Sequence, residues 1–270
     1  MIPAWTDAEI HASLDLQAAV PGVLEHFAQF KRDSAAVMAR HRVGKHFYGS
    51  TPAEYWLEIA PASEAPASPL AIFIHGGYWR AFTADELMFV AEPILAQDMR
   101  FLSINYALCP AVSFTTLVDQ VLAAVDAIAA RFPGRPIWLI GHSAGAHLAM
   151  MACRRDRHRP GPPIVRASLV SGIYDLAPVA RSFLQAELHL TAPEVRGCSP
   201  LYAPADLAVH YHLLHGQHET PIFRQQSRDM ACALSAQGAT VRSDVVAAVD
   251  HFEILSAVFD ADGPMLAGVN

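Results

Sequence analysis

Residues 137–150 read IWLIGHSAGAHLAM, an apolar run that ends in the pattern GHSAG and continues as a second apolar, alanine-rich run. The first run is typical of a buried strand and the second of a helix. Between a strand and a helix, G-x-S-x-G predicts a sharp turn that presents a serine hydroxyl above the end of a sheet. The pattern alone is weak, because glycine and serine are common in turns, but this setting predicts that Ser143 is a nucleophile.

On both sides of this turn, strand-like runs alternate with amphipathic runs of helical length. The predicted strands cover residues 54–60, 70–75, 100–106, 136–142, 164–172, 209–216 and 240–247. The predicted helices lie near 84–97, 113–131 and 222–236, after residue 144 and after residue 251. Such alternation predicts an α/β fold, a mostly parallel central sheet with helices on both faces.

The domain organisation follows from composition along the chain. No linker divides residues 1–270, so one domain is expected. Its N-terminal helical segment (1–45) carries apolar residues at helical spacing, and Pro21-Gly22 should split it into two short helices over a face of the core or an entrance. Residues 173–207 are irregular and proline-rich, which predicts a small cap-like insertion over the C-terminal edge of the sheet.

Composition excludes several classes of partner. Of the 270 residues, 53% are hydrophobic and 17% charged, and the formal net charge is −7 without a basic run. This balance argues against nucleic acid and anionic membranes, and leaves a small-molecule substrate as the expected partner. The absence of a membrane-length apolar run and of a basic N-terminus predicts a cytoplasmic protein. Four scattered cysteines fit reduced thiols. The oligomeric state stays open, a homodimer included.

A serine nucleophile needs a base oriented by a carboxylate, in the chain order serine, acid, histidine. His251 follows the last predicted strand and opens the last helix, so we predict that it is the base. His142 and His147 flank Ser143 and are interpreted as packing or supporting groups. The histidines in 210–218 (HYHLLHGQH) resemble a metal cluster, but no carboxylate or cysteine set completes it, so no metal is expected.

The expected acid lies after the penultimate strand, where the sequence reads LLHGQHETPIF. The carboxylate there is Glu219, and glutamate is chemically adequate to hold an imidazole tautomer. Asp175, after the preceding strand, is the main alternative. Asp250 is a weaker one, since a residue adjacent to His251 usually points its side chain elsewhere.

The run AIFIHGGYW (71–79) is a buried strand that ends in two glycines. Taken alone, Gly-Gly is a tight turn. Given Ser143, the better interpretation is an oxyanion hole, formed by the N–H groups of Gly76 and Gly77 together with that of Ala144. Tyr78, Trp79 and Phe82 either line an aromatic substrate pocket or pack beneath the cap, and the sequence favours neither.

Several stretches together resemble the arylformamidase (kynurenine formamidase) branch of the α/β-hydrolases. They are HGGYW (75–79), GHSAG (141–145), SGIYDL (171–176), CSPLYA (198–203), GQHETPIFRQQS (216–227) and DHFEIL (250–255). The resemblance implies hydrolysis of N-formyl-kynurenine to kynurenine and formate without a cofactor. The family usually has Asp where this chain has Glu219, and related HGGxW proteins also hydrolyse simple esters.

Three functions therefore stay open: an aryl-formamide hydrolase, a carboxylesterase of small acyl esters with the same triad, and a non-catalytic binding module. The last is disfavoured, because a pure binder has no need of a serine, a histidine and a Gly-Gly loop together.

Overall fold

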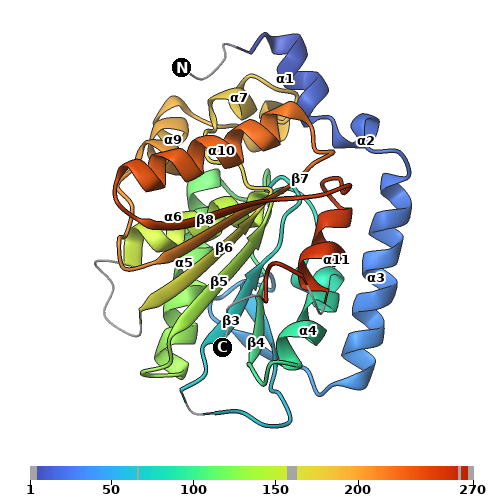
Figure 1. Ribbon diagram of the computed structural model, residues 1–270, viewed down its shortest axis with the longest axis vertical. Coiled ribbons are helices and arrows are strands. Elements are labelled where there is room, and N and C mark those ends of the chain that lie inside the picture. Colours follow the sequence, from blue (N-terminus) through green and yellow to red (C-terminus); the bar gives the residue numbers. More distant parts are fainter. Residues whose placement is uncertain (1–4, 66, 157–162, 261–262, 267–270) are drawn as a thin grey trace.

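The computed structural model describes residues 5–65, 67–156, 163–260 and 263–266 (Figure 1). Within these residues one eight-stranded sheet has the order β1-β2-β4-β3-β5-β6-β7-β8. Strands β3 to β8 pair in parallel. At one end of the sheet β2 pairs antiparallel with β4, and β1 pairs antiparallel with β2. The strands are β1 (Gly44–Phe47), β2 (Tyr55–Ile59), β3 (Leu70–Ile74), β4 (Phe101–Ile104), β5 (Ile137–His142), β6 (Ile164–Val170), β7 (His210–Gly216) and β8 (Thr240–Val246).

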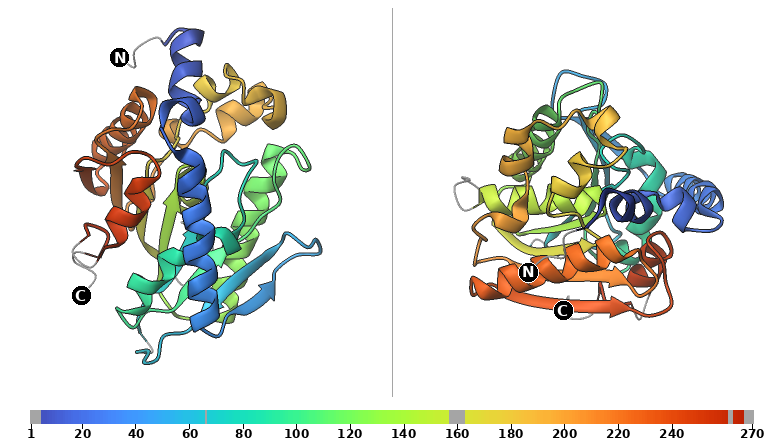
Figure 2. Two further views of the ribbon diagram at one scale, coloured as in Figure 1. Left: turned by 90° about the vertical axis from the view of Figure 1, so that its right-hand side faces the viewer. Right: turned by 90° about the horizontal axis from the view of Figure 1, so that it is seen from above.

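Helices cover both faces of this sheet. α5, α6 and α10 lie on one side, η1, α4 and α11 on the other, and α3 runs lengthwise outside η1 (Figures 1 and 2). The helices are α1 (Asp7–Leu14), α2 (Leu16–Ala19), α3 (Val23–Arg40), the 3-10 helix η1 (Ala84–Val90), α4 (Ala91–Leu95), α5 (Phe114–Arg131), α6 (Ala144–Asp156), α7 (Ala177–Ala180), α8 (Gln185–Leu188), α9 (Ala192–Gly197), the 3-10 helix η2 (Pro200–Tyr202), α10 (Pro221–Ala236) and α11 (Glu253–Phe259). The predicted α/β class and mostly parallel sheet are confirmed.

The central strands explain why the functional loops meet. Every residue of β3 and β5 is buried, as expected for apolar strands covered on both faces. Because β3, β5, β6 and β7 are parallel, their carboxyl ends lie at one edge of the sheet. The loops that leave this edge contain residues 76–82, 143, 171–175 and 219, and this edge is where open α/β sheets bind ligands.

The N-terminal segment differs in detail from its prediction. Three helices replace the expected two, because Asp15 both ends α1 and caps α2, where its carboxylate accepts from the Ala18 N–H at 3.1 Å. Gly22 then starts α3 with a φ of 76°. Residues 1–4 of this segment lie outside the described residues.

Two further segments depart from the predicted elements. The helix predicted near 84–97 is a 3-10 helix followed by the five-residue α4, with a kink at Leu87 (φ −125°). Strand β1 was not expected from the sequence. Its residues pair with β2 at the edge of the sheet and alternate only between half-buried and exposed, which is a weak periodic signal.

Polar contacts fasten the N-terminal segment across the carboxyl edge of the sheet. Thr220 Oγ1 donates to the Ser13 carbonyl at 2.7 Å, and Arg181 pairs with Asp7 at 2.7 Å. Residues 173–207 contribute α7, α8, α9 and η2 near the same edge (Figure 2). In the part of the chain that the structure describes, no helix combines the length and apolar character that crossing a membrane requires.

Candidate active site

Ser143 occupies the turn between β5 and α6. Its φ of 55° is in the left-handed region, which a non-glycine residue adopts at a cost in free energy, as at strained functional turns. The Ser143 N–H donates to the Val170 carbonyl at 2.8 Å, which fastens the turn to β6. A Cβ at Gly145 would overlap the Ile74 carbonyl oxygen, so only glycine lets α6 approach β3 this closely.

His251 and Glu219 form a buried pair. Nδ1 of His251 lies 3.0 Å from Oε2 of Glu219, and their side chains are only 2% and 0% exposed. The other carboxylate oxygen of Glu219 accepts from the Gly216 N–H and from Ser171 Oγ, each at 2.6 Å. Because a carboxylate accepts hydrogen bonds, Nδ1 of His251 carries the hydrogen and Nε2 is left as the basic nitrogen.

Asp175, the alternative acid, is engaged elsewhere. Its Oδ1 accepts from the Ala177 N–H at 2.9 Å, and its Oδ2 accepts from the Tyr202 hydroxyl at 2.9 Å. These contacts hold the start of α7 and η2. Of the two carboxylates, the structure places Glu219 against His251.

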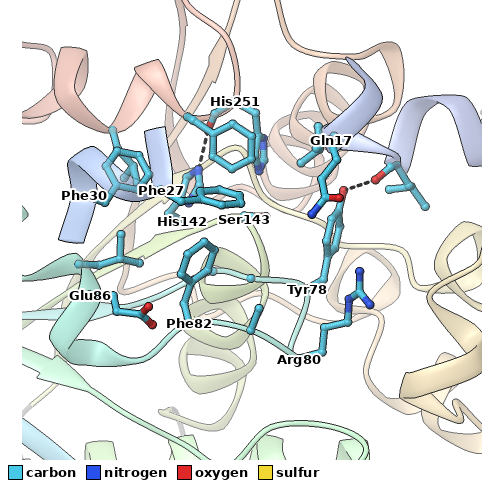
Figure 3. A pocket seen from close by; sticks show the side chains of 18 of the residues that line it. Gln17, Phe27, Phe30, Tyr78, Arg80, Phe82, Glu86, His142, Ser143 and His251 are labelled. Atoms are coloured by element: carbon cyan, nitrogen blue, oxygen red, sulfur yellow. Dashed lines mark hydrogen bonds between the residues drawn. The ribbon is translucent and has the colours of Figure 1, made fainter. Parts of the chain in front are cut away.

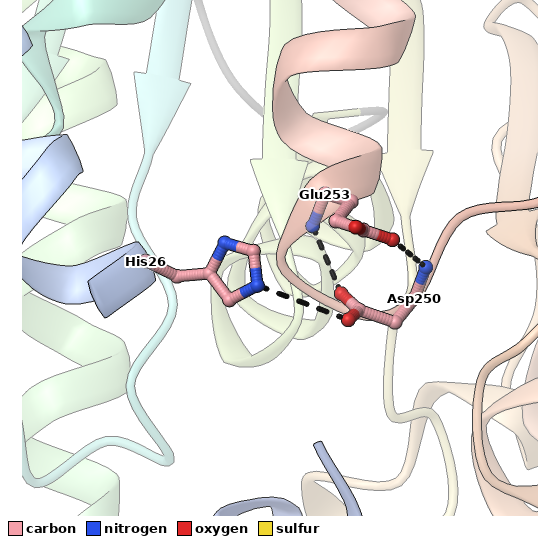
Figure 4. A group of neighbouring side chains, drawn as sticks. All are labelled: His26, Asp250 and Glu253. Atoms are coloured by element: carbon pink, nitrogen blue, oxygen red, sulfur yellow. Dashed lines mark hydrogen bonds and ion pairs between the residues drawn. The ribbon is translucent and has the colours of Figure 1, made fainter. Parts of the chain in front are cut away.

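Asp250 acts as a helix cap beside His251 (Figure 4). Its Oδ1 accepts from the N–H groups of Phe252 at 2.8 Å and Glu253 at 3.0 Å, and Glu253 Oε2 accepts from the Asp250 N–H at 3.0 Å. His26 on α3 lies 3.9 Å from the Asp250 carboxylate. These bonds fix the backbone on both sides of His251.

The same three side chains are the described residues whose ligand atoms come close enough together for a metal ion. The candidate ligand atoms of His26, Asp250 and Glu253 lie within 4.8 Å of one another. Capping accounts for both carboxylates, so we assign no metal to this group. In the 210–218 stretch, His212 Nε2 lies 2.8 Å from Asp244 on the neighbouring strand β8, a pairing across the sheet.

The Gly-Gly loop approaches the serine turn closely. A Cβ at Gly76 would lie 2.8 Å from the His142 carbonyl oxygen and 3.0 Å from the Ser143 Cβ, so any side chain there would collide with the turn. Gly77 follows with a φ of 106°. Ala144, the third predicted donor, is fully buried and opens α6 directly after Ser143.

The residues after Gly77 continue in an unusual backbone conformation. Tyr78, Trp79 and Phe82 have φ values of 50°, 58° and 68°, a concentration of left-handed non-glycine residues that is typical of functional loops. The loop is held by the Arg80 N–H, which donates to the Gly77 carbonyl at 3.0 Å. The Tyr78 hydroxyl also donates to the Leu14 carbonyl in the N-terminal segment at 2.9 Å.

A cavity of about 580 Å³ opens in front of Ser143, His251 and the Gly-Gly loop (Figure 3). Its aromatic wall comes from the N-terminal segment, the Gly-Gly loop, residues 173–207 and the residue before α11: Phe27, Phe30, Tyr78, Phe82, Phe183 and Phe252. Its charged residues are Asp15, Lys31, Arg80, Glu86 and Glu187. Arg80 pairs with Glu187, and Lys31 pairs with Glu86 at 2.9 Å. The cavity is therefore mostly apolar with two ion pairs in its wall.

Trp79 does not lie where a substrate-binding side chain would. It is fully buried and packs edge to face against Phe114 and His147, each with ring centroids 5.2 Å away. Among the described residues, the cavity wall includes Tyr78 and Phe82 but not Trp79. The left-handed backbone sends neighbouring side chains in different directions, so of the two interpretations left open, packing applies to Trp79 and pocket lining to the other two.

Three histidines around the site, His75, His142 and His147, are buried. Burial lowers the pKa of His75 and of His147 to about 4, and burial together with the nearby His251 lowers the pKa of His142 well below its usual value. His75 stacks on Tyr106, with ring centroids 4.3 Å apart. These three rings are neutral parts of the fold at neutral pH.

Some residues of the site escaped the sequence analysis. Ser171 contacts Glu219, and the aromatic and charged wall residues of the N-terminal segment reach the cavity from more than 100 positions away along the chain. No local pattern marks such contacts. For Ser171, its place directly after a parallel strand was the available signal.

Comparisons with known proteins agree with this fold. A family model described as the alpha/beta hydrolase fold matches residues 71–254. The kynurenine formamidase of Danio rerio is 32% identical over 79% of this chain and 75% of its own length. A solved Silicibacter protein described as a thioesterase superposes with a TM-score of 0.85 at 23% identity, covering 97% of this chain and 98% of the other. An esterase of Pyrobaculum calidifontis gives 0.70 at 17%, covering 85% and 84%. These two structures show the fold.

The chain thus belongs to the α/β-hydrolase family, and it is a hydrolase. Within that family, its relatives place it in the arylformamidase (kynurenine formamidase) branch.

Proposed function

We propose that the protein hydrolyses an aryl formamide, N-formyl-L-kynurenine, to L-kynurenine and formate through a formyl-enzyme on Ser143. The observation that carries this proposal is a single cavity, lined by Ser143 and by a His251 paired with Glu219, whose walls are aromatic. The relatives named kynurenine formamidase supply the substrate class.

In this mechanism Nε2 of His251 takes the hydroxyl proton of Ser143 while Oγ attacks the formyl carbon. The negative oxygen that forms accepts from the N–H groups of Gly76, Gly77 and Ala144. His251 then gives its proton to the departing aryl nitrogen, and the electrons of the C–N bond leave with it. Water, deprotonated by the same nitrogen, releases formate. Glu219 holds the imidazole throughout and stabilises its charged form.

The wall of the cavity matches the rest of this substrate. The kynurenine side chain ends in an ammonium and a carboxylate, and Arg80 with Glu187 offers one partner for each. Phe27 and Phe82, edge to face with centroids 4.9 Å apart, offer an apolar surface for the aryl ring.

The experiment that tests the proposal compares N-formyl-kynurenine with 4-nitrophenyl acetate on the purified protein, with Ser143→Ala as the control. A far larger kcat/KM for the formamide, lost in Ser143→Ala, is the expected result. Turnover of the ester alone would leave the catalytic residues in place and make the protein a carboxylesterase. Failure of an active-site-serine probe to label Ser143, together with no turnover, would instead support a binding module.

A further inference from the structure

His142, the variable residue of the G-x-S-x-G turn, contacts the base as well as the oxyanion loop. Its Nε2 lies 2.9 Å from the main-chain carbonyl oxygen of His251, and the two rings are 4.8 Å apart between centroids (Figure 3). A carbonyl oxygen only accepts hydrogen bonds, so Nε2 of His142 must carry a hydrogen. This contact fixes the tautomer of the ring.

The second ring nitrogen of His142 is therefore an acceptor. The residue is buried, with only 4% of its surface exposed, and burial keeps the ring neutral by lowering its pKa. Nδ1 faces the Gly-Gly loop, since a Cβ at Gly76 would lie 3.2 Å from it. His142 also lines the cavity, and the hydrogen bonds among the described residues give Nδ1 no partner. A lone pair thus lies beside Ser143 and Gly76.

Amides and esters differ at the atom that such an acceptor would meet. The nitrogen of a secondary formamide carries a hydrogen, whereas the corresponding oxygen of an ester carries none. An acceptor at this position stabilises the amide and offers the ester oxygen only another lone pair. Because hydrogen-bonding sites discriminate strongly between substrates that do and do not match them, this one atom can set specificity.

We propose that Nδ1 of His142 accepts a hydrogen bond from the N–H of the scissile formamide and so favours secondary amides over esters. This inference rests on the proposed function, in which His251 protonates the leaving nitrogen.

The timing of the hydrogen bond explains its effect on rate. When Oγ of Ser143 has added to the formyl carbon, the nitrogen becomes pyramidal, and its lone pair is no longer delocalised into the carbonyl group. That lone pair must face Nε2–H of His251 to take the proton, so the N–H must point elsewhere. Nδ1 of His142 accepts a hydrogen bond from this N–H, and it neither takes nor gives a proton. The C–N bond then breaks with its electrons on nitrogen, and the aryl amine leaves.

Two substitutions separate this role from the support that His142 gives to the His251 loop. In His142→Gln, the side-chain amide can still donate to the His251 carbonyl from the position of Nε2, but nothing occupies the position of Nδ1. In His142→Asn, the amide places an acceptor near the position of Nδ1 and falls short of the His251 carbonyl. His142→Gln thus keeps only the contact with the His251 carbonyl, and His142→Asn keeps only the acceptor at the position of Nδ1.

The measurement is kcat/KM for formanilide and for phenyl formate, which differ only in N–H against O, with spontaneous hydrolysis subtracted. We expect both variants to lose activity on both substrates. We expect the formanilide to phenyl formate ratio to fall about 5- to 10-fold in His142→Gln, the loss of one hydrogen bond. In His142→Asn the ratio should stay within about twofold of wild type. Because the comparison is a ratio within one preparation, partial unfolding of a variant cancels.

An unchanged ratio in His142→Gln, or an equal fall in both variants, would overturn the inference. If wild type hydrolyses N-formyl-kynurenine while either of these outcomes holds, the proposed function stands and the role of His142 fails. If wild type hydrolyses phenyl formate but neither formamide, both fail.

Discussion

Nδ1 of His251 lies 3.0 Å from Oε2 of Glu219, a contact between side chains 32 positions apart that are both withdrawn from solvent. Oε1 of the same carboxylate is held by the N–H of Gly216 and the hydroxyl of Ser171. All three partners of Glu219 donate, so the site is built for a group that only accepts. In the proposed triad, glutamate takes the place that aspartate usually has.

Removing the charge of Glu219 should therefore slow the chemical step. In Glu219→Gln an amide NH₂ must face one of three donors, which favours the wrong tautomer of His251. We expect kcat to fall by about 10³- to 10⁴-fold, the effect of the corresponding change in a serine triad. Glu219→Asp keeps the charge but shortens the reach by one methylene, so its activity should lie between that of wild type and Glu219→Gln. Steady-state kinetics on N-formyl-kynurenine measure both.

Asp175→Asn is the matched comparison, since it changes the other carboxylate after a parallel strand. Asp175 contacts Ala177 and Tyr202 rather than His251, so its substitution should alter stability more than kcat. The assignment of Glu219 would be wrong if Asp175→Asn cost as much kcat as Glu219→Gln while the variant remained folded.

Gly76→Ala tests the close approach of the Gly-Gly loop to the serine turn. The new methyl group would lie 2.8 Å from the His142 carbonyl oxygen and 3.0 Å from the Ser143 Cβ, so the loop must shift and its N–H groups move with it. Loss of one aligned oxyanion donor typically lowers kcat by about 10²- to 10³-fold, and we expect a loss of this size. Gly197→Ala is the control, because a Cβ there meets nothing within 4 Å. Equal kcat for the two variants would show that Gly76 holds no donor in place.

Much of the fold and of the candidate site could be predicted from local sequence patterns. The seven predicted strands correspond to β2 to β8, because buried parallel strands are continuous apolar runs that stand out between turn residues. The GHSAG turn was recognisable because its geometry demands small residues at fixed offsets around Ser143. His251 and Glu219 could be chosen among many candidates because topology orders the loops at one edge of the sheet.

The features of the site that the sequence did not predict depend on contacts between residues far apart in the chain or on the backbone conformation of a loop. Trp79 and Tyr78 are neighbours with the same aromatic character, and only the left-handed backbone of the loop separates a packed side chain from a lining one. The ion pair between Arg80 and Glu187 joins residues 107 positions apart. His142 was interpreted as a packing or supporting group. That the described residues offer Nδ1 no hydrogen-bond partner can be seen only once the partner of Nε2 is known.

Arg80→Gln tests whether Arg80 in the cavity wall binds the carboxylate of the substrate. Arg80 is partly exposed to the cavity and pairs with Glu187, so a substrate carboxylate can compete for it. We expect KM for N-formyl-kynurenine to rise about tenfold, the value of a partly screened charge-assisted hydrogen bond. KM for formanilide, which has no charged groups, should change by less than about twofold.

Arg181→Gln is the control for this prediction. It removes another arginine ion pair, with Asp7 at 2.7 Å, that lies outside the cavity wall. It should leave the KM of both substrates unchanged. An equal rise in KM for both substrates in Arg80→Gln would mean that Arg80 shapes the loop and does not bind charge.

Three buried histidines with lowered pKa values, His75, His142 and His147, should make folding stability depend on pH. The pKa of His75 and of His147 is about 4 in the folded protein, lowered chiefly by burial from an ordinary value of 6.5. As pH falls below 6.5, the unfolded chain binds protons at these positions that the folded protein does not. The free energy of unfolding therefore decreases between pH 6.5 and 4, and this contribution levels off below about 4. Burial raises the pKa values of Glu64, Glu92 and Glu194, but their hydrogen bonds to arginine, histidine and threonine outweigh it and lower these values, so they act in a more acidic range.

Urea unfolding followed by fluorescence between about pH 7.5 and 5 measures this dependence as a slope. Each histidine should contribute up to about 1.4 kcal/mol per pH unit, and up to about 3 kcal/mol over the whole range. His147→Phe removes one titrating group while keeping a ring against Trp79 and Phe114, so the slope should decrease by about one proton whatever the absolute stability of the variant. Phe114→Leu disturbs the same packing without removing a titrating group, and it should lower stability at every pH with the slope unchanged. A wild-type slope of zero across this range would mean that His75, His142 and His147 are protonated equally in the folded and unfolded states.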